Sequence, residues 1–169
     1  MSRRALLWLV PLFIVLHNLE EMAFMPSLLA VLPGKIPVWA TSWLPPGLFP
    51  PSYRQFLFML LVVTLLPYLF ALLGGAKRER GLRTFLLAGA QTVMLVNVLS
   101  HVGAMNLMNG YVPGLASALA INLPFSLFFF GAGLRQGWLK WGDFAYLLPI
   151  AVVLHGPGLL GLMLLVKGW

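Results

Sequence analysis

Cysteine is absent from this sequence of 169 residues, which excludes disulfide bonds and thiolate metal sites. Acidic residues are also scarce, with four Asp and Glu against eleven Lys and Arg. Charged residues make up only 9% of the chain, whereas a soluble domain carries roughly 25%. The chain therefore has too few charges to cover a soluble domain, and any metal ion would need His, carboxylate or amide ligands.

Hydrophobic residues, in contrast, make up 60% of the chain and recur in long runs separated by short polar segments. A run of about 20 apolar residues is long enough to span a bilayer as a helix. The sequence therefore predicts an all-α, polytopic membrane helix bundle of about five transmembrane helices, which form a single transmembrane domain over residues 1–169. The predicted helices cover approximately residues 5–25, 53–73, 84–108, 115–134 and 143–166.

Proline and glycine set the predicted helix boundaries, because they weaken or end helices. Pro26 is expected to end the first helix, and the Pro- and Trp-rich segment 26–52 to form an outer loop that caps the bundle. Gly74-Gly75 is expected to end the second helix. Gly156-Pro157-Gly158 is expected to interrupt the fifth helix and to line a cavity, since broken backbone at membrane depth needs protein or a cavity beside it.

The net charge of +7 falls in the loops and is unequal between the two sides of the predicted bundle. The side of the N-terminus holds Arg3, Arg4, Lys77, Arg78, Arg80, Arg83, Arg135 and Lys140, and the other side holds Lys35, Arg54 and Lys167. Because Lys and Arg are enriched in cytoplasmic loops, this asymmetry predicts an N-in, C-out topology. We expect an integral membrane protein, in the inner membrane if the cell is bacterial, with membrane lipids and no nucleic acid as partners.

Ionisable side chains inside the predicted spans form a short set: all three histidines, His17, His101 and His155, and two of the four acidic residues, Glu20 and Glu21. Such groups are costly in a bilayer and commonly mark functional sites. At a rise of ~1.5 Å per residue, the three histidines lie roughly 18 to 25 Å from the predicted inner edge. They are therefore expected in one layer, between the midplane and the outer leaflet.

Two asparagines, Asn97 and Asn122, are expected at roughly the same depth, ~20 Å from the inner edge. They are candidate supporting residues for a site, or simple hydrogen-bond partners between helices. The same structural alternative applies to His155, which could bond a neighbouring helix beside the Gly-Pro-Gly segment.

His17, Glu20 and Glu21 stand at positions i, i+3 and i+4 and share one helix face. A histidine and a carboxylate one turn apart can hold a metal ion, as the reverse Glu-x-x-His spacing does in di-iron helix bundles. Together with His101 and His155 they form a ligand set suited to zinc or non-haem iron, with a two-metal site left open. In a dry site without metal, at least one glutamate is expected to be protonated. The spacing does not separate the roles of the two glutamates.

The string His17-Asn18-Leu19-Glu20-Glu21, a further histidine and Tyr111-Val112-Pro113-Gly114 resemble the signature of the HXXEE family of integral membrane proteins. That family is defined by an H-x-x-E-E motif, another histidine and a Y-x-P-G motif. The resemblance implies that His101 is the family's second histidine, and it adds Tyr111 as a candidate catalytic residue or cap of the site. Alternatively, Tyr111 is an aromatic anchor in an interfacial turn. The resemblance implies no activity, since the family is one of unknown function.

We therefore expect an integral membrane enzyme that depends on a metal and acts on a lipid or another hydrophobic substrate. Its His/Glu site would lie in the outer half of the bilayer, with Glu20 or Glu21 as metal ligand or general base. Hydrolysis is favoured over oxidation or reduction, because membrane di-iron enzymes are much richer in histidine.

Two alternatives remain open at this point. The first is a metal-free acid–base isomerase or cyclase of an isoprenoid-like substrate, in which a protonated Glu20 or Glu21 donates the proton. The second is a transporter coupled to protons or ions, since buried His and Glu also form relays. The small size and the lack of an internal repeat argue against a transporter, although assembly into an oligomer is left open.

Overall fold

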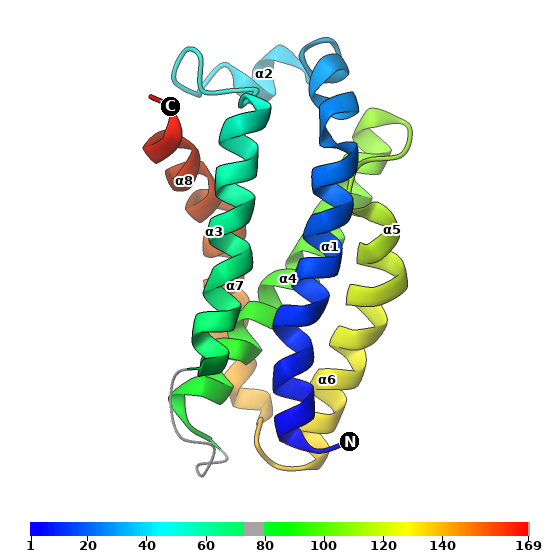
Figure 1. The fold of residues 1–169 in the computed structure, drawn as a ribbon, viewed down its shortest axis with the longest axis vertical. Coiled ribbons are helices and arrows are strands. Elements are labelled where there is room, and N and C mark those ends of the chain that lie inside the picture. Colours follow the sequence, from blue (N-terminus) through cyan, green and yellow to red (C-terminus); the bar gives the residue numbers. More distant parts are fainter. Residues whose placement is uncertain (73–79, 169) are drawn as a thin grey trace.

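The computed structural model describes residues 1–72 and 80–168 (Figure 1). Within these residues every regular element is helical, and five helices are long and apolar enough to cross a membrane. These are Arg3–Gly34, Tyr53–Leu72, Leu82–Met108, Leu115–Arg135 and Trp141–Val166. The two termini lie at opposite ends of the bundle, as an odd number of spans requires (Figure 1). The predicted all-α fold with five apolar spans is confirmed for the described residues, and it fits an integral membrane protein.

The first helix, α1 (Arg3–Val31), continues through Pro26. A proline has no N–H to donate to the carbonyl four residues earlier, which here belongs to Met22. The hydroxyl of Tyr53, at the start of α3 (Tyr53–Leu72), donates to the Met22 carbonyl oxygen at 2.9 Å. The prediction that Pro26 ends the helix is therefore wrong, because a side chain from the next span replaces the missing donor.

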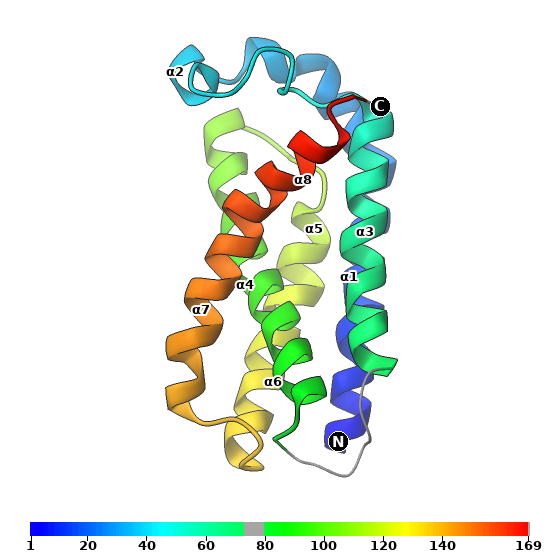
Figure 2. The same ribbon diagram turned by 90° about the vertical axis from the view of Figure 1, so that its left-hand side faces the viewer.

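Beyond α1, the chain makes a 3₁₀ turn at Leu32–Gly34 and then crosses the end of the bundle to reach α3 (Figures 1 and 2). This crossing contains the short helix α2 (Val38–Thr41). Trp39 and Trp43 are 75% and 66% exposed there. Exposed tryptophans at the end of apolar helices are typical of a membrane–water interface.

The third span, α4 (Leu82–Met108), packs against α1, α3, α6 and α7. It ends at Asn109, whose left-handed backbone (φ 51°) turns the chain into the loop that carries the Y-x-P-G motif. The fourth span then follows as one continuous helical segment. It consists of α5 (Leu115–Ser117), a π-helical turn at Ala118–Asn122 and α6 (Leu123–Arg135).

The fifth span contains α7 (Phe144–Val153) and α8 (Leu159–Val166), joined by a π-helical turn at Leu154–Gly158. The interruption predicted at Gly156-Pro157-Gly158 is therefore a local widening of the helix rather than a break. Pro157 cannot donate a backbone hydrogen bond, and a π turn accommodates such a position within a continuous helix. α7 packs against α4, and α8 packs against α3 (Figure 2).

Two apolar cores hold the spans together. The larger one lies toward the N-terminal end and includes Leu6, Val10, Leu87 and Phe129. The smaller one lies toward the opposite end and consists of Leu32, Met108, Val112 and Leu115. Along α1 and α4, the stretches that carry the motif histidines fall between these two cores. The polar site thus occupies a layer of its own.

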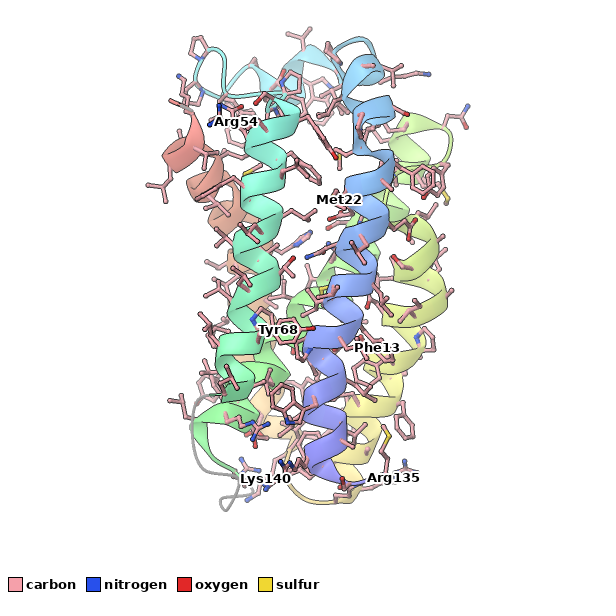
Figure 3. The ribbon with its side chains drawn as sticks, viewed as in Figure 1. Phe13, Met22, Arg54, Tyr68, Arg135 and Lys140 are labelled. Atoms are coloured by element: carbon pink, nitrogen blue, oxygen red, sulfur yellow. The ribbon has the colours of Figure 1, made fainter. Side chains whose placement is uncertain are left out.

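Charged side chains gather at the two ends of the bundle. Arg135 and Lys140 lie at the end of the bundle that holds the N-terminus, and Arg54 lies at the opposite end of the bundle (Figure 3). The Arg80 side chain donates a hydrogen bond to Asp143 at 2.8 Å. This ion pair joins the third and fifth spans near the first residue of each span. Residues 77 and 78, predicted as inner-loop charges, and the predicted second-helix end at residues 73–75 lie outside the described residues.

Candidate functional site

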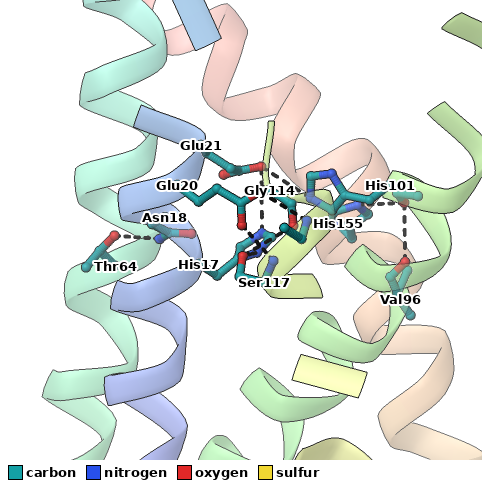
Figure 4. A network of polar contacts seen from close by, with 12 residues as sticks. His17, Asn18, Glu20, Glu21, Thr64, Val96, His101, Gly114, Ser117 and His155 are labelled. Atoms are coloured by element: carbon teal, nitrogen blue, oxygen red, sulfur yellow. Dashed lines mark hydrogen bonds and ion pairs between the residues drawn. The ribbon is translucent and has the colours of Figure 1, made fainter. Parts of the chain in front are cut away.

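His17, Glu21 and His101 each offer one possible metal-ligand atom, and these three atoms all lie within 4.8 Å of one another. Glu21 Oε1 is 3.7 Å from His17 Nε2 and 3.4 Å from His101 Nε2. The two imidazole rings meet edge to face, with their centroids 5.0 Å apart. Figure 4 shows the three side chains converging from α1 and α4. The group could therefore hold a metal ion.

The His17 ring is almost completely buried, with 1% of the residue exposed. Its Nε2 atom is buried and has no hydrogen-bond partner among the described residues. An unpaired buried polar atom costs about 1–3 kcal/mol, so native proteins seldom leave one without a reason. A metal ion bound between His17, Glu21 and His101 would supply a partner for this nitrogen.

Ser117 contacts one of the two ring nitrogens of His17. The Ser117 hydroxyl donates to the carbonyl oxygen of Gly114 at 3.3 Å, and its oxygen lies 2.9 Å from His17 Nδ1. If the single hydroxyl proton points to Gly114, Ser117 accepts a hydrogen bond from Nδ1–H of His17. In that tautomer Nε2 carries the lone pair that metal binding requires.

Gly114, the last residue of the Y-x-P-G motif, packs directly against the three candidate ligands. Its backbone is left-handed (φ 86°), a conformation that favours glycine. A Cβ atom at this position would lie 2.6 Å from His101 Cε1, 2.8 Å from His17 Cε1 and 2.9 Å from Glu21 Cγ. The motif therefore needs glycine for two independent reasons, its backbone conformation and the space that the site leaves.

Glu20 faces different partners from those of Glu21. One of its oxygens accepts hydrogen bonds from the Tyr111 hydroxyl at 2.5 Å and the Ala116 N–H at 3.1 Å. The other accepts from the Ser117 N–H at 2.6 Å. Three donors fit an ionised carboxylate, and two of them are free backbone N–H groups at the start of a helical span. Glu20 therefore fastens the Y-x-P-G loop to α1 and lies outside the metal-ligand group.

Tyr111 lies in the loop after α4, where it is 53% exposed and its ring meets Phe24 edge to face at 5.9 Å. Partial burial, together with the hydrogen bond to the Glu20 carboxylate and its charge, raises the pKa of Tyr111 to about 12. At neutral pH the phenol is therefore protonated and donates to Glu20. The structure places the side chain in the loop between α4 and α5, where its hydroxyl reaches Glu20 beside the site.

His155 is half-buried beside the three-residue group and is not a member of it. Its Nε2 lies 2.8 Å from the hydroxyl oxygen of Ser100, which immediately precedes His101. Figure 4 shows this side chain next to His101. His155 thus contacts a side-chain hydroxyl of a neighbouring helix, where the alternative to metal ligation had been a bond to a backbone carbonyl, and the ligand role of His155 stays a prediction.

The two asparagines also stay outside the ligand group. Asn122 is 1% exposed, and its Nδ2 has no partner among the described residues. The buried Oδ1 of Asn97 likewise has no partner among them. Their supporting role therefore remains a prediction. Sequence reasoning missed Ser117 and named Gly114 only as part of the Y-x-P-G motif, because neither spacing nor residue type shows that they contact His17.

The family model for the protein of unknown function with HXXEE motif matches residues 8–129. The matched region contains both motifs, the three candidate ligands, Glu20 and Tyr111, whereas His155 lies beyond it. No curated protein and no solved structure matches the chain. Because the match covers most of the chain, the protein belongs to the HXXEE family, whose function is unknown.

Proposed function

We propose that this protein is a membrane enzyme that depends on a metal ion held by His17, Glu21 and His101. The observation that carries the proposal is the buried, unpaired Nε2 of His17, which faces the other two candidate ligands. Two imidazoles and one carboxylate are the protein ligands of many catalytic zinc sites and of non-haem iron oxygenases. Such sites keep one or more positions open, whereas structural zinc sites are closed by four protein ligands.

Zinc and a hydrolytic reaction are the ion and the chemistry that we propose. A zinc ion with three protein ligands polarises carbonyl groups and lowers the pKa of water to about 7. Iron would fit the same ligands, but it requires an oxidant for its chemistry. In this scheme Tyr111 and Glu20 are positioning residues, because the single proton of the Tyr111 hydroxyl is donated to the Glu20 carboxylate.

A lipid or another hydrophobic molecule is the substrate class that fits the position of the site. The ligands lie within α1 and α4, between the two apolar cores. Large apolar side chains nearby, including Met22, Phe24 and Leu99, are 38%, 50% and 68% exposed and would contact lipid. A molecule dissolved in the bilayer would therefore meet an apolar surface around the site.

The contacts of Glu20 argue against Glu20 as the proton donor of a metal-free acid–base reaction. A glutamate that donates a proton must be neutral. One of its oxygens then carries the proton, so the carboxyl group can accept fewer hydrogen bonds. Here three donors point at the Glu20 carboxylate, which fits the charged form.

The proposal can be tested with purified protein in liposomes that contain lipids with ester and phosphoester bonds. Mass spectrometry of the lipids is expected to show a hydrolysis product that chelation abolishes and added zinc restores. Glu21→Gln and His101→Ala are expected to abolish the product. Asp143→Asn, which removes a carboxylate far from the site, is expected to retain it. Turnover that survives chelation or the Glu21→Gln change would overturn the proposal.

A further inference from the structure

An apolar groove lies beside the candidate site, at the outer end of α1. It encloses about 200 Å³ between the last turns of α1 and the segment that ends α4 and begins the Y-x-P-G loop. Its apolar walls include Phe24, Leu28 and Val31 from α1, and Met108 and Pro113 from the facing segment. A concave surface of this composition suits the apolar body of a ligand.

Lys35 gives the groove a positive charge. It lines the groove just beyond the end of α1, is exposed, and forms no ion pair with a described acidic residue. An ammonium group at the end of an apolar groove complements a ligand that carries an anionic group at the end of an apolar chain. A groove with this charge would favour an acid over the corresponding alcohol.

Tyr111 connects the groove with the candidate site. Its ring lines the groove beside Phe24, and its hydroxyl donates to Glu20 at 2.5 Å. At the rise of an α-helix, Phe24 and Val31 are separated by about 10 Å along α1, and Lys35 lies beyond the 3₁₀ turn that follows. A ligand that extends from Lys35 to Tyr111 thus spans an apolar distance of this order.

We propose that the groove binds a single-chain amphiphile with an anionic headgroup, which lies at Lys35 while the chain follows α1 toward Tyr111. Such a substrate carries its anionic group and its reacting part at opposite ends of an apolar segment. That this ligand is the substrate rests on the proposed function, but its binding to the groove does not require the metal ion.

The test uses the full chain in lipid nanodiscs, with a diazirine-bearing palmitic acid and the matching palmityl alcohol as photoaffinity probes. Mass spectrometry of the digested protein measures how strongly residues 24–31 are labelled. The acid is expected to label this segment about fivefold more than the alcohol, since hydrogen bonds to charged groups are roughly twice as strong as neutral ones. Lys35→Gln is expected to remove this preference. Arg54→Gln, which removes another cation at the same end of the bundle (Figure 3), is expected to retain it.

A second pair of variants fills the groove without removing a charge. Val31 is 51% exposed, so Val31→Trp can be accommodated, and it is expected to reduce labelling by both probes. Val38→Trp, at a position that is 79% exposed and outside the groove, is the control. Equal labelling by acid and alcohol, or labelling unchanged by Lys35→Gln or Val31→Trp, would overturn the inference.

Labelling with chelator present and in His101→Ala separates the two proposals. Acid-specific labelling that persists with chelator and in His101→Ala supports the groove, whereas the same labelling in a wild-type protein that binds no added zinc overturns the metal enzyme alone. Absence of acid-specific labelling in a protein that binds zinc overturns the groove alone.

Discussion

At His17, the two nitrogens of one imidazole ring have separate surroundings. Nδ1 is bonded to Ser117, from the fourth span, while Nε2 faces Glu21 and remains without a hydrogen bond. Gly114 closes the same space from the loop that precedes Ser117. The H-x-x-E-E and Y-x-P-G motifs are therefore two parts of one site, joined by contacts between single atoms.

Gly114→Ala is predicted to disrupt the site, because the added Cβ would lie less than 3 Å from atoms of three candidate ligands. The left-handed backbone adds strain for any residue other than glycine. We expect a loss of roughly 1–3 kcal/mol of stability in a detergent unfolding experiment. Gly103→Ala in α4 is the matched control, because nothing lies within 4 Å of its Cβ position. Equal stability of the two variants would contradict the packing of Gly114.

Tyr111 gives a pH-dependent prediction. Its pKa of about 12 in the folded protein is above the ordinary value of 10.0, so the folded state favours the protonated phenol. The stability that this contributes is fully present below pH 10.0 and is lost as the pH rises through about 12. Thermal unfolding between pH 10.0 and about 12 is expected to show that the difference in melting temperature between the wild type and Tyr111→Phe shrinks as the pH rises. A difference that does not change with pH would contradict the Glu20 contact.

At the scale of helices, α1 and α3 are joined by polar side chains as well as by apolar packing. Asn18 Nδ2 donates to Thr64 Oγ1 at 2.6 Å (Figure 4), and the Thr64 hydroxyl donates to the Leu60 carbonyl at 2.6 Å. Asn18 is 7% exposed, so water competes little for this bond. Tyr53 provides the second link, through the Met22 carbonyl that Pro26 leaves free.

A double-mutant cycle with Asn18→Leu and Thr64→Val is predicted to give a coupling free energy of about 0.6 kcal/mol, as is typical inside membranes. Unfolding equilibria in detergent give the free energy of unfolding of the wild type, the two single variants and the double variant. The cycle of Thr64→Val with Asn106→Leu is the control, because Asn106 bonds a carbonyl of its own helix. Coupling of the Asn18 pair no larger than that of the control pair would show that the bond adds nothing between α1 and α3.

The sequence was sufficient to predict five helices, because length and hydropathy determine which segments can cross a bilayer. It could not predict the end of α1, which depends on a donor from Tyr53, far away along the chain. Nor could it predict the π-helical turn at Leu154–Gly158, because proline and glycine allow either a break or a wider turn. Local residues determine where a helix can be interrupted, and tertiary contacts decide whether it is.

The site was predictable to the extent that charges stand out in an apolar chain. His17, Glu21 and His101 could be selected because ionisable groups are rare within spans. The different surroundings of Glu20 and Glu21 could not be derived, since both share a helix face with His17 and only the folded chain brings Tyr111 to one of them. Ser117 resembles any small residue in a helix until its contact with His17 is known.

At the scale of the whole molecule, charge and polarity are divided into layers. Basic side chains lie at the ends, two apolar cores follow inward, and the His/Glu group lies between the cores. The more basic end is that of the N-terminus, which includes Arg135 and Lys140 (Figure 3). This asymmetry is typical of a cytoplasmic end, so the N-in, C-out orientation stays our prediction.

The absence of cysteine makes this orientation easy to test. Ser2→Cys and Gly168→Cys each introduce one thiol, at opposite ends of the chain, without a competing native thiol. With an impermeant maleimide, intact cells are expected to be labelled at residue 168 and only permeabilised cells at residue 2. Labelling of residue 2 in intact cells would reverse the orientation, and equal access at both positions would argue against an odd number of spans.

The metal content of the purified protein tests the central claim most directly. Elemental analysis after purification without chelator and exposure to zinc is predicted to give about one zinc ion per chain. His17→Ala, Glu21→Gln and His101→Ala are predicted to lose the ion, while the matched change Glu20→Gln retains it because Glu20 is bonded elsewhere. A wild-type protein that binds no metal, or a zinc content unaffected by His101→Ala, would contradict the account.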